Sequence, residues 1–431
     1  MDQTVWADDQ IQGIVRSVLV VEGDKHKQQR KVMNPAFGPT QIRELTEIFV
    51  AKSLQLRDIW AAGNANQGGH SRVEVLSWLS RTTLDIIGLA GFNYRFDALN
   101  ENHEHNELSA AFATVFDAGA KKTMIPVLRA WVPFFRFLRV DRDKETEQSQ
   151  ATMARIGREL LQGSKASINE KSAWKTRDLL SLLVKSNMAT DIPAHQRMSE
   201  HDVLAQVPTF LVAGHETTST GTTWALFALT QNTAAQDKLR EELLAVDTDT
   251  PTMDELNALP YLDMVVREAM RVHAPVPSTT RQATQDDILP FAKPFTDRKG
   301  IVHDFIRIRK GQNIQVPIQA INRDMAIWGE DAKVFKPERW EKIPQGASAI
   351  PGVWGNMLTF LGGPRACIGY RFSIVEMKAL LFTLVRAFEF ELAVPPEDVM
   401  KKETVVQRPV LASDPRAGSQ MPLLIRPVVR A

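Results

Sequence analysis

The sequence predicts a mainly α-helical protein with a smaller β-rich part. Three long segments, residues 74–92, 201–229 and 371–388, repeat apolar residues at helical spacing. Two short segments, 313–318 and 423–427, have the length and the apolar character of strands. A chain of 431 residues with 44% hydrophobic content can bury a large core, so we expect residues 1–431 to form a single domain.

The composition excludes several classes of protein. A formal net charge of +1 gives no bulk attraction to nucleic acid. Cys367 is the only cysteine, which excludes an intramolecular disulfide framework and a multi-cysteine zinc site and suits a reducing compartment. The sequence shows no signal-peptide pattern and no apolar run long enough to cross a bilayer.

The first half of the chain is predicted to be a series of helices. Helical patterns cover residues 23–31, 41–60, 74–92, 144–163 and 178–185, with polar loops at 63–69 and 163–177. In the first of these helices, His26 and Arg30 are four residues apart and share one face. A solvated basic helix start would give the same pattern.

Residues 101–139 are predicted to form two helical segments, which Pro126 and Pro133 interrupt. This region is rich in aromatic residues, namely Trp131, Phe134, Phe135 and Phe137. Such side chains line a channel, dip into a membrane surface or simply pack in the core, and the sequence leaves these alternatives open.

The long segment 201–229 has an unusual centre, Ala213-Gly214-His215-Glu216-Thr217-Thr218. Glycine and threonine are poor helix formers, and a threonine hydroxyl can bond back to its own helix. We therefore expect a small groove in the middle of this helix. The alternative explanation is a threonine-rich polar helix face, which a shorter pattern of these residues would favour.

The following segment contains paired charges and then prolines. Helices are predicted at 235–245 and 261–272, and in the second one Glu268 and Arg271 are three apart and can pair. Such a pair usually lies at the surface and contributes little to stability. Pro275 and Pro277 then end the helix and force an extended strand.

The remaining elements before and after Cys367 are shorter. A hairpin-type turn at residues 310–312 precedes the strand 313–318, and a helix is expected to begin at Asn322. After the helix 371–388 we expect a strand at 390–394, a turn at 408–411 and the last strand at 423–427.

Cys367 lies in the segment Phe-Leu-Gly-Gly-Pro-Arg-Ala-Cys-Ile-Gly, residues 360–369. The start of the next helix favours a thiolate there, and Arg365 can hold an acidic group of a ligand. Gly362, Gly363 and Gly369 let the backbone turn tightly and approach a flat ligand. A buried free cysteine is the alternative reading of any isolated cysteine.

The spacing Phe360-x-x-Gly363-x-Arg365-x-Cys367-x-Gly369 resembles the haem-binding motif of the cytochrome P-450 superfamily at every fixed position. The central motif of 201–229 resembles the oxygen-activation motif of the same family. Glu268-x-x-Arg271 and the later Phe335-Lys336-Pro337-Glu338-Arg339-Trp340 resemble two further family motifs. The resemblance extends from about residue 26 to residue 424.

The resemblance implies a role for each matched residue. Cys367 would be the axial thiolate ligand of the iron of haem b, which favours O–O cleavage. Other cofactor-binding residues would be Arg365, Phe360, Gly363, Gly369, His26, Arg30, Arg281, Ala213 and Gly214. Among these, His26, Arg30 and Arg281 match positions that bind haem propionates.

The resemblance also implies residues for proton delivery, for structure and for substrate contact. Thr217 would hydrogen-bond dioxygen, and Glu216 would feed protons from solvent. Glu268, Arg271 and Arg339 would form a buried triad that locks the cysteine segment. Substrate-pocket residues would be Val276, Pro277, Ser278, Thr279, Thr280, Val410 and Leu411.

By resemblance, the protein would be a fungal microsomal monooxygenase that inserts one oxygen atom of O2 into an apolar organic substrate. Secondary metabolism (a terpenoid substrate is one guess) or xenobiotic oxidation would be the context. Electrons would come from an NADPH-dependent flavoprotein reductase, and Lys25, Lys27 and Lys31 would help to dock an acidic donor. The protein would be a monomer that binds no nucleic acid.

By resemblance, we expect the sequence to lack the family's N-terminal membrane anchor, first helices and part of the sheet. The full-length family type lies on the cytoplasmic face of the endoplasmic reticulum membrane. One alternative is therefore a non-catalytic haem-binding remnant. A second is a cysteine hydrolase that uses Cys367 and a histidine. A third, a family member that isomerises or dehydrates without a reductase, is disfavoured by the intact Glu216–Thr217 pair.

Overall fold

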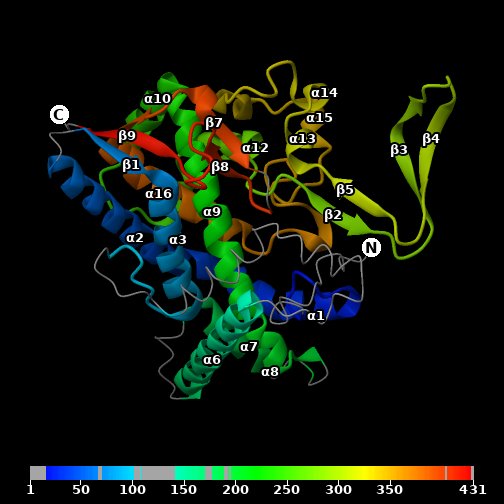
Figure 1. The fold of residues 1–431 in the computed structure, drawn as a ribbon, viewed down its shortest axis with the longest axis horizontal. Helices are drawn as coiled ribbons and strands as arrows, with labels where there is room; N and C mark the ends of the chain where they lie inside the picture. The colour runs from blue at the N-terminus through cyan, green and yellow to red at the C-terminus, as the bar shows by residue number, and fades with distance from the viewer. Residues whose placement is uncertain are drawn as a thin grey trace.

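The computed structural model describes residues 16–66, 70–100, 107, 141–169, 177–188, 193, 196–402 and 405–428. In these residues helices predominate and short strands form four small sheets, which confirms the predicted fold class (Figure 1). The aromatic residues Trp131, Phe134, Phe135 and Phe137 lie outside the described residues. No helix in the described part is both long and apolar enough to span a bilayer.

The N-terminal helices are α1 (Gly23–Met33), α2 (Pro39–Asn66) and α3 (Val75–Phe92), with the 3-10 helix η2 (Asn34–Phe37) after α1. Helix α2 is longer than predicted and includes the first half of the loop expected at 63–69. Helix α3 agrees with its prediction because its ends are well defined. The Glu74 carboxylate accepts from Ser77 N at 2.6 Å, and Asn93 ends the helix with a left-handed φ of 50°.

The middle of the chain contains α6 (Asp141–Asn169), α7 (Leu179–Met188), α8 (Glu200–Leu204) and α9 (Gln206–Thr230). The link predicted at 163–177 begins inside α6, which continues to Asn169. The single helix predicted at 201–229 is divided into α8 and α9 at Ala205. Ser199 and Asp202 form a capping box that begins α8.

Helices α9 and α16 (Tyr370–Ala387) form the centre of the molecule (Figure 1). Helix α16 is buried along almost its whole length and packs against α2, α9 and α10. Helix α9 crosses α3 so closely that a methyl group added at Gly214 would lie 2.9 Å from the Ile87 side chain. The apolar side chains of these helices form one continuous hydrophobic core.

Shorter helices lie between α9 and α16 in the sequence. They are α10 (Thr233–Leu244), α11 (Met253–Asn257), α12 (Pro260–Val272), α13 (Ile318–Asn322), α14 (Met325–Trp328), η5 (Pro337–Glu341), α15 (Gln345–Ser348) and η6 (Gly363–Arg365). The helix expected to begin at Asn322 was placed wrongly. Asn322 ends α13, and Asp324 caps α14 through its side chain.

The strands form four separate antiparallel sheets. The largest has the order β1-β9-β6, and the others are the pairs β2-β5, β3-β4 and β7-β8. The bounds are β1 (Ser71–Glu74), β2 (Thr279–Gln282), β3 (Asp287–Thr296), β4 (Val302–Ile308), β5 (Asn313–Val316), β6 (Phe388–Leu392), β7 (Val399–Lys402), β8 (Arg408–Leu411) and β9 (Pro422–Pro427).

Three sheet predictions need correction. The turn at 310–312 does not join a hairpin, because β5 pairs with β2 instead of with β4. The β3–β4 hairpin, which projects from the body of the molecule in Figure 1, was not predicted. Residues 408–411, expected as a turn, form strand β8 and pair with β7.

Candidate functional site

The cysteine segment is a tight turn that ends at the start of α16. Cys367 N donates to the carbonyl oxygen of Phe360 at 2.9 Å, and Gly369 is the N-cap of α16. The Cys367 side chain is exposed, yet the surrounding protein raises the pKa of its thiol by burial. The Gly369 N–H and the charge of Arg30 oppose this rise without overcoming it. The thiol is therefore accessible, as the ligand of a cofactor must be.

Two glycines of the segment are required by its backbone. Gly363 has a φ of +66°, in the left-handed region that favours glycine. A Cβ on Gly362 would lie 1.7 Å from the carbonyl oxygen of Pro351. Gly369 differs from these two, because a Cβ there would meet only ordinary contact with Phe37 at 3.8 Å. The close backbone approach is therefore between two chain segments at Gly362.

We predict that Gly362→Ala displaces the cysteine segment and lowers both haem content and thermal stability. A backbone carbonyl cannot move aside as a flexible side chain would, so we expect a loss of about 1–3 kcal/mol, as for other overpacked sites. Haem absorbance per protein and the unfolding midpoint measure the effect. Gly63→Ala, in helix α2 with open space around its Cβ position, is the matched control and should be neutral or stabilising. Equal behaviour of the two variants would contradict the prediction.

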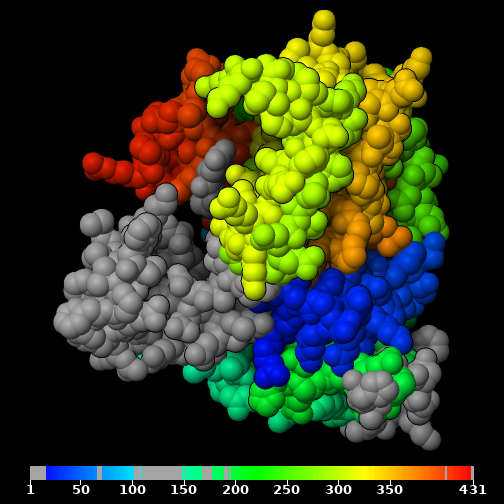
Figure 2. Space-filling model, turned by 90° about the vertical axis from the view of Figure 1, so that its right-hand side faces the viewer, coloured from blue at the N-terminus to red at the C-terminus, as the bar shows by residue number. Residues whose placement is uncertain are grey.

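Basic side chains gather around Cys367. Arg30 donates from Nη1 to the carbonyl oxygen of Ala366 at 2.8 Å, which ties α1 to the cysteine segment. In Figure 2 the orange segment that leads to α16 borders the blue surface of the N-terminal helices. Arg365 donates to the carbonyl oxygens of Val18 (3.2 Å) and Val21 (2.7 Å) and forms an ion pair with Glu22. Its guanidinium is thus held by the chain itself, which the sequence did not predict.

Electrostatic effects show that these basic groups lie close together. Burial, Arg365 and Arg30 lower the pKa of His26 to about 4, so its imidazole is neutral at pH 7. Burial and Arg365 also lower the pKa of Arg281. Arg281 donates to Thr279 Oγ1 and to the Thr280 carbonyl oxygen, both at 2.9 Å. This surplus of positive charge beside a thiol fits a cofactor with carboxylate groups, as haem has.

The predicted oxygen-activation motif is an accessible stretch in an otherwise buried helix. Ala213 is exposed and residues 214–217 are half-buried, while residues 218–226 are buried. Thr217 Oγ1 donates to the Ala213 carbonyl oxygen at 2.7 Å, so the hydroxyl bonds back to its own helix as expected. Thr218 Oγ1 donates to Ser373 Oγ at 3.2 Å, which joins this stretch to α16 six residues after Cys367.

Glu216 is bound by two basic side chains. It forms an ion pair with Arg408 of β8, and its Oε1 lies 3.4 Å from His215 Nε2. Burial alone would raise the pKa of Glu216, but His215 and Arg408 outweigh it and lower the pKa to about 2. The carboxyl is therefore ionised at neutral pH. The sequence did not predict Arg408 as its partner.

The predicted structural triad is present and fully buried. Glu268 Oε1 accepts from Arg271 Nη2 at 2.7 Å and from Arg339 Nε at 3.2 Å. Glu268 also accepts from the Lys336 backbone N–H at 3.0 Å and from Trp340 Nε1 at 3.0 Å. Apart from the Glu268–Arg271 pair, which lies within α12, these bonds connect α12 to residues 336–340, so the triad fixes the chain that leads to Cys367.

The remaining predicted residues are placed as follows. Val276, Pro277, Ser278, Thr279 and Thr280 are half-buried along the chain that enters β2, and in β8 Val410 is half-buried and Leu411 is buried. Phe360 is buried, with its ring centroid 5.6 Å from that of Trp354. The docking of an acidic donor by Lys25, Lys27 and Lys31 stays a prediction, and Lys25 also forms an ion pair with the buried Asp202. Lys27 and Lys31 are exposed.

Glu376 is a further acid that sequence reasoning missed. It is fully buried in α16, and burial raises the pKa of its carboxyl well above the ordinary value. Thr218 of α9 opposes this rise in pKa. A signal was present in the sequence, because Glu376 is a charged residue within a run of apolar helical positions.

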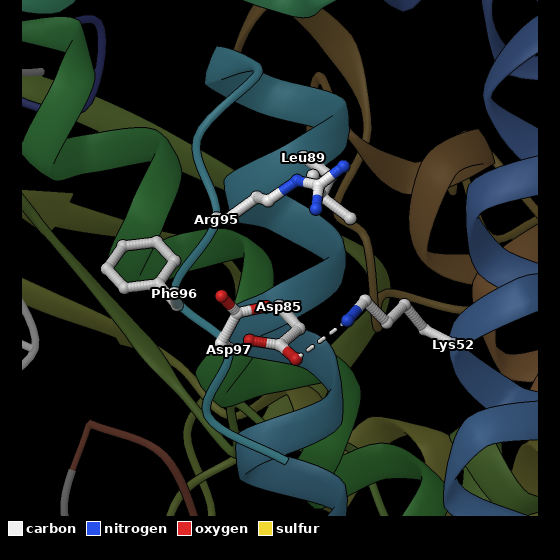
Figure 3. Close-up of a pocket in the computed structure, with 6 residues that line it drawn as sticks. All are labelled: Lys52, Asp85, Leu89, Arg95, Phe96 and Asp97. Carbon is white, nitrogen blue, oxygen red and sulfur yellow. Dashed lines mark hydrogen bonds and ion pairs between the residues drawn. The ribbon is translucent and has the colours of Figure 1, made fainter. Parts of the chain in front are cut away.

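A separate pocket of about 220 Å³ lies between α2, α3 and the chain after α3 (Figure 3). Lys52, Asp85, Leu89, Arg95, Phe96 and Asp97 line it. Lys52 Nζ lies 3.0 Å from Asp85 Oδ2, and Asp85 Oδ1 accepts from Ala98 N at 2.7 Å. The charges that line this pocket thus connect α2 to α3, and none of the predicted site residues belongs to it.

Comparison with known proteins adds independent information. The family model for cytochrome P-450 matches residues 2–413. Cytochrome P-450 monooxygenase 205 of Postia placenta is 56% identical over 418 residues, which cover 95% of this chain and 77% of that protein. Monooxygenase 128 of the same fungus is 52% identical, with 97% and 79% covered. Monooxygenase claP of Ampulloclitocybe clavipes is 37% identical, with 96% and 77% covered.

Proposed function

Because the chain belongs to the cytochrome P-450 family of haem-thiolate monooxygenases, we propose that it oxidises an apolar organic substrate and that Cys367 would be the thiolate ligand of its haem. Residues 1–431 would act as one catalytic domain. The accessible thiol beside a surplus of basic side chains is the observation that carries this proposal. The family also implies O2 and a reductase as partners.

The chain's own residues would hold the cofactor and control protons. Haem b would supply the activation of dioxygen. His26, Arg30 and Arg281 would bind its carboxylates, and Arg365, whose guanidinium is held by Glu22, would add positive charge near them. Phe360, Gly363 and Gly369 would shape the turn against it, and Ala213 and Gly214 would leave room for it. Thr217 would orient dioxygen by a hydrogen bond, and Glu216 would pass on protons from solvent.

Residues near β2 and β8 support the proposed substrate class. Val276 and Pro277 together with Val410 and Leu411 offer mainly apolar contacts, while Ser278, Thr279 and Thr280 add hydroxyl groups. We infer oxidation in fungal secondary metabolism, with a terpenoid as one candidate substrate, or xenobiotic oxidation. An NADPH-dependent flavoprotein reductase would supply the electrons. The full-length family type would act at the cytoplasmic face of the endoplasmic reticulum.

Two measurements test this function in order. The reduced protein with carbon monoxide should show a strongly red-shifted Soret band, and a reductase with NADPH should then drive oxygen consumption. Products from terpenoid, fatty-acid and aromatic panels would identify the substrate. A red-shifted band without any NADPH consumption would support the second candidate, a haem-binding remnant. The cysteine hydrolase is set aside because the family is a haem-thiolate family.

Thr217→Ala is expected to uncouple the reaction. Positioned proton transfer contributes about 10²–10⁴-fold to enzymatic steps, so we expect at least a tenfold lower ratio of product to NADPH. Peroxide should account for the lost product. Thr217→Ser keeps the hydroxyl and is the matched control. Unchanged coupling in the alanine variant would remove Thr217 from the proton path.

A further inference from the structure

Arg408 and Glu216 join two elements that are far apart in the sequence. Arg408 is the first residue of β8, and Glu216 lies in the accessible stretch of α9 beside Thr217. Their ion pair is partly shielded, with 38% of the Arg408 side chain and 22% of the Glu216 side chain exposed. Since Glu216 would pass on protons in the proposed function, whatever holds its carboxylate affects proton delivery.

The backbone beside Arg408 is fixed against α9. Gln407 N donates to the carbonyl oxygen of Pro275 at 2.7 Å, and the Gln407 carbonyl oxygen accepts from Trp224 Nε1 at 2.8 Å. Trp224 is eight residues after Glu216, or about 12 Å along the helix axis. The Arg408 side chain therefore reaches Glu216 from a rigid position.

His215 is a conditional partner of the same carboxylate. Its Nδ1 lies 2.9 Å from the Leu211 carbonyl oxygen, which can only accept, so Nδ1 carries the proton there. His215 Nε2 can then donate to Glu216 only when the ring carries a second proton. The Arg408 guanidinium is always charged. Arg408 is thus the permanent partner of Glu216.

Other elements packed near Glu216 present few charges to it. From α3, the uncharged Thr83 donates to the His215 carbonyl oxygen at 3.1 Å, and Ile87 faces Gly214. From α16, the titratable Glu376 interacts with the Thr218 side chain. Within the described residues, the charged or titratable groups placed against Glu216 are His215 and Arg408.

We propose that Arg408 is a positioning residue. Its ion pair holds the Glu216 carboxylate toward strand β8 and so limits proton delivery by Glu216. Arg408 and Val410 are two residues apart in β8 and share a face. The restraint therefore belongs to the same strand face as a proposed substrate contact. This inference rests on the proposed function and deepens it, because it names a residue that links the substrate pocket to the proton supply.

The test uses the haem-loaded chain with a flavoprotein reductase, NADPH and O2, without added substrate. Two electrons and two protons convert O2 to peroxide, and two more of each convert it to water, so faster proton delivery lowers peroxide per NADPH. We expect Arg408→Gln to lower this ratio by about twofold or more, because a carboxyl whose pKa moves toward the operating pH passes protons better. Arg408→Lys should stay near the parent. Arg426→Gln, which removes an exposed arginine paired with Glu391 at 3.0 Å in the β6–β9 sheet, is the matched control.

A second measurement does not depend on turnover. Infrared difference spectra of Arg408→Gln against the double variant Arg408→Gln/Glu216→Gln should show a protonated carboxyl band at a pH where the parent shows none. An unchanged or higher peroxide ratio in Arg408→Gln, or no such band, would overturn the restraint. Failure of the parent itself to consume NADPH would instead count against the proposed function. If Arg408→Gln does not fold, the infrared spectra of Arg408→Lys and of the parent are compared instead. The restraint requires that the Glu216 carboxyl bands of these two proteins be alike, and a difference between them would contradict it.

Discussion

Replacing Cys367 by alanine is expected to abolish the red-shifted Soret band of the reduced carbon monoxide complex. Cys367 is the only cysteine of the chain, so no other thiolate can replace it. The thiolate is what pushes electron density onto the iron, and monooxygenase activity should disappear with it. The basic side chains around the site remain, so we expect haem binding to weaken without being lost altogether.

The measurement is the difference spectrum of the dithionite-reduced protein with and without carbon monoxide. Thr359→Ser, one residue before the cysteine segment, is a suitable control. The Thr359 hydroxyl donates to the Met270 carbonyl oxygen at 2.8 Å, and serine keeps that hydroxyl. The control should retain the parent spectrum. A red-shifted band in Cys367→Ala would mean that another residue binds the iron and would defeat the central assignment.

The second large effect is expected at Glu268, where alanine should destabilise the fold by about 3–5 kcal/mol. Glu268 and Arg271 are both fully buried, and removal of the carboxylate leaves a buried guanidinium without its counter-charge. Arg339 and Trp340 would lose a partner at the same time. Because these bonds fix the chain that leads to Cys367, haem content should fall together with stability.

Chemical unfolding followed by far-ultraviolet circular dichroism measures this loss. The control is Glu159→Ala, which also removes a helical glutamate paired with an arginine. Glu159 Oε1 lies 2.9 Å from Arg155 Nη1, but both side chains are about half exposed. Such a surface pair is worth about 0–1 kcal/mol. Similar losses in the two variants would show that the buried network does not lock the segment.

The sequence predicted those parts of the fold whose determinants are local. Helix α3 was predicted within one residue because apolar periodicity, a capping carboxylate and a left-handed Asn93 lie within the segment. Helix α2 was predicted too short, since Gly63 suggested a loop although the helix passes through it. The β3–β4 hairpin was missed because its strands mix apolar and charged residues and face solvent on both sides.

Prediction of the candidate site followed the same division. The pairing of Glu268 with Arg271 could be predicted because it needs only helical spacing, and the structure contains this pair. The partners of Arg365 and Glu216 could not be read from spacing. Arg365 is held by Glu22, 343 residues earlier, and Glu216 by Arg408, 192 residues later. Ion pairs across such separations depend on how elements pack, and a short stretch of sequence gives no information about that packing.

The sequence by itself determined the chemistry on offer: a single thiol between glycines, a glycine–acid–threonine centre in a long helix, and two charge motifs at fixed spacing. The tertiary structure alone decided the electrostatic state of these groups. Burial raises the pKa of the Cys367 thiol despite the helix start beside it, while ion pairing lowers that of Glu216 despite its burial. Residue type sets which groups can ionise, but burial and distant partners decide which of them are charged.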